Sequence, residues 1–337
     1  MTPRTRTTVA EPFLEVIDPG LQTTVQDFPG RRGRQALGFF PSGPVDHLAF
    51  RAANLLVGNG SDAAGLEIPL GRFQAAIVRP GTIAVTGPEV PLTRNGRPLP
   101  MWESVPVEEG DVIASGVLSG PGYRTYLAVA GGIAVPEAYG SRATQLVAGI
   151  GGLDGRALER ADVLDVHVTD GGARPRRRMP SSLRPTYRRH WEIEVVRGPH
   201  ADPDYLTAED VEYLFSATWR CDLNSDRVAV RLNQHRFAWA RASGDVAGGH
   251  PSNMLDTSYP LGGVLAYGDV LTILGPDSNS SGGFAVVATV AHAALWKVGQ
   301  FRPGMDTVTF REIDLAQAAA LDEHLGRVLD SRHLATV

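Results

Sequence analysis

Short stretches rich in Val, Ile, Leu and Thr recur along this chain, and Gly and Pro separate them. Examples are TIAVTG, YRTYLAVAG, WEIEVVRG and DTVTFREI. The 38 Gly and 24 Pro among the 337 residues supply the turns between such stretches. Strands at this spacing are typical of β-barrels and β-sandwiches, rather than of a parallel sheet with helices between its strands. We therefore expect a mainly β protein.

Three segments have helical periodicity instead. Apolar residues recur at helical spacing from Pro44 to Val57, and Pro44 is suited to the first turn. Thr207 precedes Asp210 in the order of a capping box, which predicts a helix start. The residues from Asp314 onward have the pattern of an amphipathic terminal helix.

A basic segment from Thr169 to His190 predicts a domain boundary. It contains few apolar residues and reads as a solvated linker, with an anion-binding patch as the alternative. Because 337 residues are enough for two cores, we predict two tandem domains. The predicted parts are a first β-barrel domain at 12–168, the linker at 169–190, a second β-barrel domain at 191–312 and a C-terminal helix and tail at 313–337.

Composition excludes several classes of function. A formal net charge of −5 gives no reason to expect a nucleic-acid partner. Cys221 is the single cysteine, so we expect neither an intrachain disulfide nor a metal site. No run of about 18 apolar residues occurs, and the N-terminal residues lack a secretory signal pattern. We expect a cytoplasmic protein that does not enter a membrane.

Lys297 is the single lysine in a chain with 32 Lys and Arg residues. Arg-biased coding explains this composition without any functional role. The alternative is that an ammonium is needed at this position, because it differs from a guanidinium in shape and donor geometry.

The order Pro-Ser-x-x-x-Asp occurs twice, as PSGPVD ending at Asp46 and as PSNMLD ending at Asp256. A Gly-Gly pair follows each box further along the chain, at Gly131-Gly132 and at Gly282-Gly283. This matched order indicates duplication of one domain. Taken alone, the box is more often a Ser or Asx turn that stabilises a loop.

The common nucleotide-binding and nucleophile motifs are missing. GIGGLDG lacks the dinucleotide-binding spacing, and neither a phosphate loop nor a G-x-S-x-G elbow occurs. Polar residues in turn-rich loops remain. Such donors and acceptors suit a reaction whose difficult chemistry is carried by a cofactor, while the protein orients the substrate.

Several longer stretches carry a family resemblance. GLQTTVQDFPGRRG, FPSGPVDHLAFRAANLLVGN, YLAVAGGIAVP and GSRATQ resemble the carboxyltransferase family of the biotin-dependent urea carboxylase and allophanate hydrolase subunit 2 group. The same family includes the 5-oxoprolinase C subunit and the antagonist of a sporulation kinase inhibitor. The resemblance runs from about Leu14 to Phe310, and WARASGDVAGGHPSN and LWKVGQFRPG are more similar to the urea carboxylase branch.

The resemblance implies two cyclophilin-like β-barrels and a cleft that accepts biotin, as carboxybiotin on a separate carrier protein. ATP would be used only through a partner subunit. The implied partners are a sister carboxyltransferase subunit of the allophanate hydrolase subunit 1 type, a biotin carboxylase, the biotin carrier protein and a small amide substrate such as urea or guanidine.

From this resemblance we predict that Asn253 orients the substrate, because an amide both donates and accepts hydrogen bonds. Lys297 or Arg231 would stabilise negative charge, so these three are the catalytic candidates. We expect the two boxes to be equivalent turns, and Asn253, Asp256 and Lys297 to share one water-poor crevice. The predicted substrate-binding residues are Ser252, Asp256, His250, Ser42, Asp46 and Gly283.

The chain also departs from the family pattern, with Phe39 and Phe40 before the first box and GPDSNSSGGF in the second half. The sequence therefore leaves the substrate open. Two other functions fit as well: the C subunit of a 5-oxoprolinase, an ATP-dependent amidohydrolase complex, and a non-catalytic protein that sequesters its sister subunit.

Overall fold

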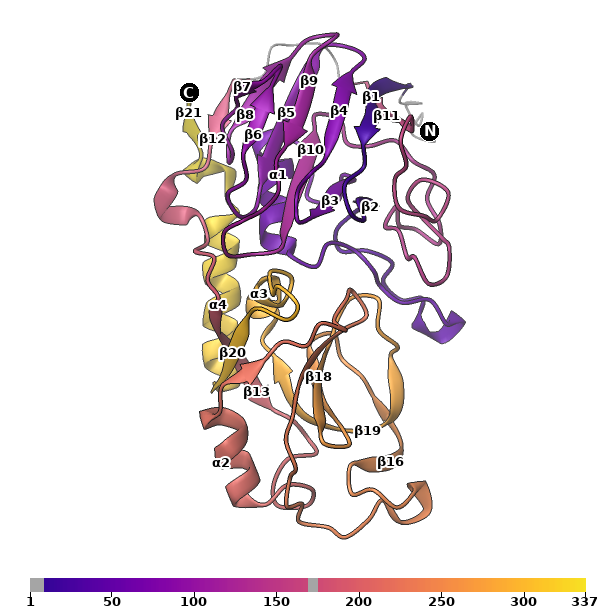
Figure 1. Cartoon of the computed structure of the whole chain (residues 1–337), viewed down its shortest axis with the longest axis vertical. Helices are drawn as coiled ribbons and strands as arrows, with labels where there is room; N and C mark the ends of the chain where they lie inside the picture. The colour runs from indigo at the N-terminus through magenta and orange to yellow at the C-terminus, as the bar shows by residue number, and fades with distance from the viewer. Residues whose placement is uncertain (1–8, 169–174) are drawn as a thin grey trace, which may run out of the picture. The chain divides into compact units, whose positions relative to one another are not determined.

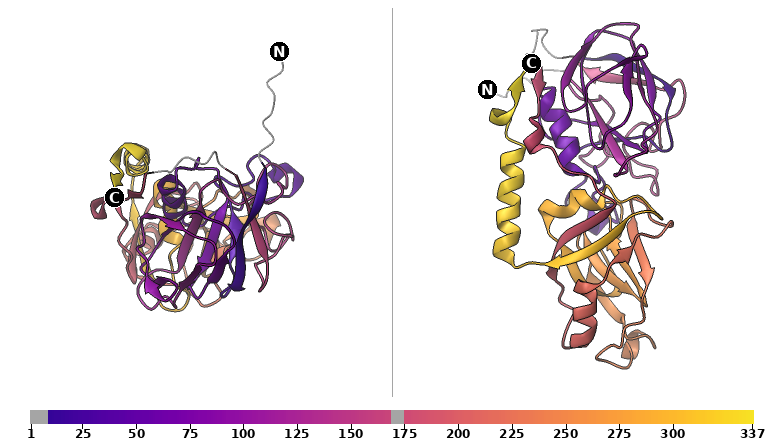
Figure 2. Two further views of the ribbon diagram at one scale, coloured as in Figure 1. Left: turned by 90° about the horizontal axis from the view of Figure 1, so that it is seen from above. Right: turned by 60° about the vertical axis from the view of Figure 1, so that its left-hand side comes forward.

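The computed structural model describes residues 9–168 and 175–337, and the chain divides into two compact units. Unit 1 comprises Met1–Arg31, Ser42–Pro185 and Leu329–Val337, and unit 2 comprises Arg32–Pro41 and Thr186–Val328. Both units are built mainly from β-strands (Figures 1 and 2), which confirms the predicted mainly β fold.

The core of unit 1 is formed by two antiparallel sheets. The first has the order β11-β1-β4-β9-β6-β7, and its strands are β1 (Ala10–Asp18), β4 (Gln74–Ile77), β6 (Leu92–Arg94), β7 (Arg97–Pro98), β9 (Val112–Ser115) and β11 (Val163–His167). The second has the order β2-β3-β10-β5-β8, and its strands are β2 (Thr24–Gln26), β3 (Gly65–Pro69), β5 (Gly81–Thr86), β8 (Ser104–Val107) and β10 (Arg124–Val129). Phe13, Leu66 and Leu127 belong to one buried cluster, so the two sheets share a core.

Helix α1 (His47–Leu56) packs against the second sheet of unit 1. The ring of Phe50 meets that of Tyr126 on β10 edge to face, with 6.0 Å between the ring centroids. The helix begins at His47 rather than in the turn of Pro44, because the Asp46 carboxylate caps it by accepting a hydrogen bond from the N–H of Ala49 at 2.8 Å.

Unit 2 is built around one sheet of eight strands. The main order is β14-β20-β13-β19-β17-β18-β15, β16 pairs with β19 outside this order, and the pairing of β13 with β20 is parallel. The strands are β13 (His190–Arg197), β14 (Trp219–Arg220), β15 (Ala229–Gln234), β16 (Asn253–Ser258), β17 (Gly263–Tyr267), β18 (Val270–Leu274), β19 (Ser281–Val290) and β20 (Thr307–Glu312). Trp191, Ile193 and Phe310 lie in its buried core.

The helices of unit 2 are α2 (Ala208–Ser216), α3 (Leu295–Val298) and α4 (Leu315–Val328). The predicted capping box of α2 is confirmed, because the Thr207 hydroxyl accepts from the N–H of Asp210 at 3.1 Å and the Asp210 carboxylate accepts from the N–H of Thr207 at 3.2 Å. Helix α4 is the predicted terminal helix. Five single turns of 3-10 helix complete the described parts of the two units: η1 (Gln35–Leu37), η2 (Ser181–Leu183), η3 (Asp245–Ala247), η4 (His292–Ala294) and η5 (Ser331–His333).

The predicted linker is only partly visible, because its residues 169–174 lie outside the described residues. Its described part is more structured than a solvated linker. Strand β12 (Arg177–Arg178) pairs with β21 (Ala335–Thr336), and the Met179 side chain is completely buried. The predicted domain limits stay a prediction, and the structure adds that the terminal residues 329–337 belong to unit 1.

The strand pairings of the described residues leave the two ends of each sheet order unjoined. Closed cyclophilin-like barrels are therefore not confirmed. In the part of the chain that the structure describes, no helix is both long and apolar enough to cross a membrane.

Candidate functional site

The first box supports the start of α1. Asp46 is completely buried, and besides capping α1 it donates its own N–H to the Tyr126 hydroxyl at 2.8 Å. Ser42 is 4% exposed and has a φ of 55°, in the left-handed region that few residues other than Gly adopt. The box is thus a rigid turn before a helix, and a substrate-binding role for Ser42 and Asp46 stays a prediction.

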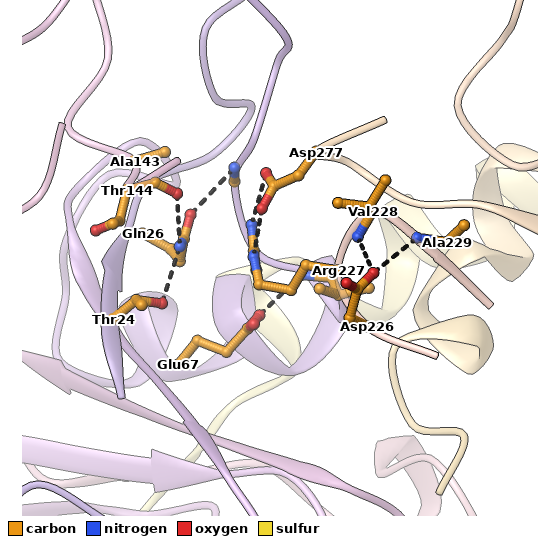
Figure 3. A network of polar contacts seen from close by, with 12 residues as sticks. Thr24, Gln26, Glu67, Ala143, Thr144, Asp226, Arg227, Val228, Ala229 and Asp277 are labelled. Carbon is orange, nitrogen blue, oxygen red and sulfur yellow. Dashed lines mark hydrogen bonds and ion pairs between the residues drawn. The ribbon is translucent and has the colours of Figure 1, made fainter. Parts of the chain in front are cut away.

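The buried Gln26 side chain fixes the same turn (Figure 3). Its carbonyl oxygen accepts from the N–H of Gly43 at 3.1 Å, and its amide nitrogen donates to the Thr24 hydroxyl at 2.9 Å and to the Thr144 carbonyl at 3.2 Å. Gln26, on β2, therefore ties the first box to the second sheet of unit 1.

The second box has a different conformation, at the start of β16 in unit 2. Ser252 is completely buried, and its hydroxyl oxygen accepts from the N–H of Gly268 at 3.2 Å and lies 2.8 Å from His250 Nδ1. The N–H of Ser252 also donates to His250 Nδ1, at 3.1 Å. Because Nδ1 accepts this bond, a neutral His250 carries its proton on Nε2. His250 and Ser252 thus hold the turn that presents Asn253.

Two glycines make room for the Asn253 side chain. A Cβ atom added at Gly244 would lie 2.8 Å from the Asn253 Cβ, and one added at Gly248 would lie 2.8 Å from the Asn253 Nδ2. Gly248 also has a φ of 124°, which other residues rarely adopt. The loop around η3 therefore positions the Asn253 amide by close backbone approach.

Arg241 is a residue of this site that was not predicted from the sequence. Its Nη2 donates to the backbone carbonyl of Asn253, and its guanidinium lies over the Tyr205 ring, 4.4 Å from the centroid. Burial, and secondly the charge of Arg241, lower the pKa of His200. The sequence feature that could have pointed to Arg241 is its position inside WARASGDVAGGHPSN, one of the stretches that carry the family resemblance.

Two buried donors lie next to the Asn253 turn. The Nε of Arg241 and the Nε1 of Trp239 are both buried, and neither has a hydrogen-bond acceptor among the described residues. The Trp239 ring meets that of His250 edge to face, with 5.5 Å between their centroids. A buried donor without an acceptor carries a free-energy cost, so these two donors are candidate contacts for an acceptor group at this turn.

The remaining residues of the second box do not match the first. Asp256 is exposed in β16, whereas Asp46 is buried as a helix cap, so the prediction of two equivalent turns is wrong. Asp256 also lies outside the hydrogen bonds of the Ser252 turn. Gly283 has a structural reason to be Gly, because a Cβ there would lie 2.8 Å from the Met254 carbonyl oxygen and separate β19 from β16.

The structure does not bring Lys297 to Asn253. Lys297 lies on α3, and α3 and β16 occupy different ends of unit 2 (Figure 1). Its ammonium donates to Glu194 Oε2 at 2.7 Å and to the Glu192 carbonyl at 2.9 Å. Burial raises the pKa of Glu194, but hydrogen bonds from Lys297 and Arg311 outweigh it, so the pKa is lowered and Glu194 stays anionic. The expected crevice shared by Asn253, Asp256 and Lys297 is therefore not formed within unit 2.

Arg231 on β15 and Arg227 just before this strand have different roles. Arg231 is an exposed residue of β15, and its N–H donates to the Ser225 hydroxyl at 3.0 Å. Arg227 is buried and forms two bonds to the Asp277 carboxylate, at 2.9 and 3.2 Å (Figure 3). Arg227 thus has a structural partner. No group of three or more His, Cys, Asp and Glu side chains in residues 9–168 and 175–337 could hold a metal ion.

Replacing Gly248 with alanine should displace the Asn253 amide and lower the activity of the complete enzyme by about tenfold or more, because a misplaced orienting group costs that much or more. The adjacent Gly249→Ala is the matched control, since its added Cβ meets no atom within 4 Å. Equal activity of the two variants, both folded by circular dichroism, would contradict the positioning role of the loop.

The chain belongs to the carboxyltransferase family, because residues 37–312 match the family described as carboxyltransferase domain, subdomain A and B. The urea amidolyase of Lachancea kluyveri is 40% identical over 318 residues, which cover 92% of this chain and 17% of that protein. The 5-oxoprolinase C subunit of Haemophilus influenzae is 27% identical over 314 residues, covering 92% of this chain and 94% of that protein.

A solved structure agrees with this assignment. That of the Kluyveromyces lactis urea carboxylase superposes with a TM-score of 0.89 at 38% identity, covering 96% of this chain and 29% of that chain. This chain therefore spans less than a third of its urea amidolyase and urea carboxylase relatives.

Proposed function

We propose that this chain is the carboxyltransferase subunit of a biotin-dependent carboxylase, and that it transfers a carboxyl group from carboxybiotin to a nitrogen of urea, guanidine or a related small amide. The observation that carries the proposal is the pair of buried donors beside Asn253, Arg241 Nε and Trp239 Nε1. Family membership and the urea amidolyase relatives support the same conclusion.

The donor set fits the group that biotin carries. When bound, carboxybiotin supplies a carboxyl group, whose oxygens only accept hydrogen bonds. Arg241 and Trp239 offer donors already fixed by burial, which stabilise negative charge without reorganisation. Asn253 offers both a donor and an acceptor to the N–H and C=O groups of a small amide.

The other residues of the site position Asn253. His250 and Ser252 hold its turn, and Gly283 lets β19 approach β16 closely. Because Lys297 and Arg231 have no contact with this turn, we assign the stabilisation of negative charge to Arg241 in their place. Substrate-binding roles for Asp256, Ser42 and Asp46 stay proposals.

The proposal includes partners. This chain spans 17% of a urea amidolyase, and the remaining steps would need other domains or subunits. We propose a sister carboxyltransferase subunit, a biotin carboxylase that uses the ATP, and a biotin carrier protein. We also propose that each unit corresponds to one cyclophilin-like barrel of the family.

A second candidate is the C subunit of a 5-oxoprolinase. One observation favours it: this chain spans 94% of the Haemophilus influenzae protein of that name and 93% of the Escherichia coli one.

The two candidates differ in what purifies with the chain. We expect a pull-down from the native cell to bring a biotinylated protein, detected by a streptavidin blot. The purified complex should then fix labelled bicarbonate into urea or guanidine. ATP-dependent ring opening of 5-oxoproline without a biotinylated protein would support the second candidate. A tight complex with no turnover of either substrate would show a non-catalytic partner.

A further inference from the structure

A cavity of about 640 Å³ lies within unit 2, where the residues before β13 meet α3. Cavities of this volume hold small organic molecules. None of the residues of the Asn253 turn lines it, so the proposed carboxyl transfer does not account for it. The lining residues are Thr186, Arg188, His190, Trp191, Glu192, Trp296 and Lys297.

One side of the cavity is aromatic and held in place. The Trp296 ring meets the Trp191 ring edge to face, with 6.0 Å between the ring centroids and 81° between the ring planes. It also meets the Tyr187 ring edge to face, with a centroid distance of 6.2 Å and an angle of 85°. Trp191 is itself anchored, because its Nε1 donates to the buried Asp306 carboxylate at 3.1 Å. A wall of fixed indole rings favours a ligand with a flat body.

The Lys297 ammonium supplies a directed positive charge. An ammonium has three N–H donors. Two of them bind Glu194 Oε2 and the Glu192 carbonyl, and within the described residues these are the partners of Lys297. The third donor is available to a ligand in the cavity that Lys297 lines.

The charge around the cavity favours an anion. Alternate residues of β13 share one face, which carries Glu192 and Glu194 opposite Arg311 of the parallel strand β20. Arg311 binds both carboxylates, at 3.0 and 2.8 Å. With Lys297 and the exposed Arg188, three cationic side chains surround these two acidic ones. The two carboxylates are therefore already neutralised, and the remaining net charge of these five side chains is positive.

We propose that this cavity binds a small flat organic carboxylate, with its ring against Trp296 and its carboxylate on Lys297 and Arg188. The site is independent of the proposed carboxyl transfer. A neutral ligand of the same shape would leave the third Lys297 donor without a charged acceptor, and hydrogen bonds between charged groups are about twice as strong as neutral ones.

Titration calorimetry with benzoate and benzamide tests the proposal, because the two probes share a ring and differ in charge. We expect benzoate to bind the full chain at least about tenfold more tightly than benzamide. We expect Trp296→Ala and Lys297→Gln each to weaken benzoate about tenfold or more, and Lys297→Arg to retain much of it, since one charged hydrogen bond is worth roughly that factor. The matched control is Arg327→Gln on α4, because the Arg327 side chain is 64% exposed and lies outside the cavity lining.

Because Lys297 is the single lysine, a second measurement does not depend on any substitution. Acetic anhydride modifies amines, so the chain presents Lys297 and its terminal α-amine, and the α-amine serves as an internal standard. By peptide mass spectrometry, benzoate should slow acetylation of Lys297 relative to the α-amine, and benzamide should not. Equal binding of both probes, or benzoate binding with no protection of Lys297, would overturn the proposal.

Discussion

Replacing Asn253 with alanine should reduce carboxyl transfer by about a hundredfold or more, since loss of one fixed polar group at a reacting centre has effects of that size. The thermal midpoint should move by only about 2 °C or less, because the Asn253 side chain is only half-buried. The measurement is fixation of labelled bicarbonate into urea or guanidine by the complete complex, together with a thermal melt of each variant.

The matched control for this experiment is Leu255→Ala. Leu255 lies on the same strand, β16, and is 77% exposed, so it tests whether any change in this strand lowers the rate. A folded Asn253→Ala variant with an unchanged rate would remove Asn253 from the site. A Leu255→Ala variant as slow as Asn253→Ala would indicate instead that the strand as a whole matters, through docking of a partner.

The largest expected effect on stability comes from Asp277→Ala. The side chains of Arg227 and Asp277 are 7% and 4% exposed and form a two-bond ion pair. Removing one partner of a buried ion pair costs about 3–5 kcal/mol. We expect the urea midpoint for unfolding of unit 2 to fall accordingly, followed by tryptophan fluorescence.

Glu312→Ala is the comparison variant. Its pair with Arg197 also has two bonds, at 2.7 and 2.9 Å, but the Arg197 and Glu312 side chains are 40% and 37% exposed. Exposed pairs contribute about 1 kcal/mol or less, because water solvates the charges when the pair is broken. If both variants lost the same stability, burial would not be the source of the Asp277 effect.

The sequence predicts a structural element correctly where all the residues that form its hydrogen bonds lie close together in the chain. The start of α2 follows from Thr207 and Asp210, because both hydrogen bonds of its cap lie within four residues. The start of α1 was placed too early, because Pro44 satisfies the rule for a first turn while the Asp46 carboxylate decides where the helix begins. Similarly, the mainly β fold and the family follow from the pattern of strands, turns and characteristic stretches in one sequence.

The candidate site depends on contacts that the sequence does not contain. Two boxes with the same letters differ because pairing with β19 makes residues from Asn253 onward a strand, whereas Asp46 precedes a helix. Lys297 binds Glu194 instead of lying near Asn253, and Glu194 is 103 positions before Lys297 in the chain. Arg241 becomes visible as a site residue only when its guanidinium reaches the Asn253 carbonyl.

The parallel pairing of β13 with β20 also sets an order of events during synthesis. His190 and Thr307 lie opposite one another but are 117 positions apart, and β19, the other neighbour of β13, is also made later in the chain. At roughly 5–20 residues per second, a ribosome needs between about 6 and 23 s to cover this distance. The β20 edge of nascent β13 lacks its native strand throughout that interval, and the β19 edge lacks its strand until Ser281–Val290 has been made. Unprotected edges invite pairing between neighbouring polypeptides. Slower translation or crowded polysomes should therefore make unit 2 aggregate more readily than unit 1 in the newly synthesised chain.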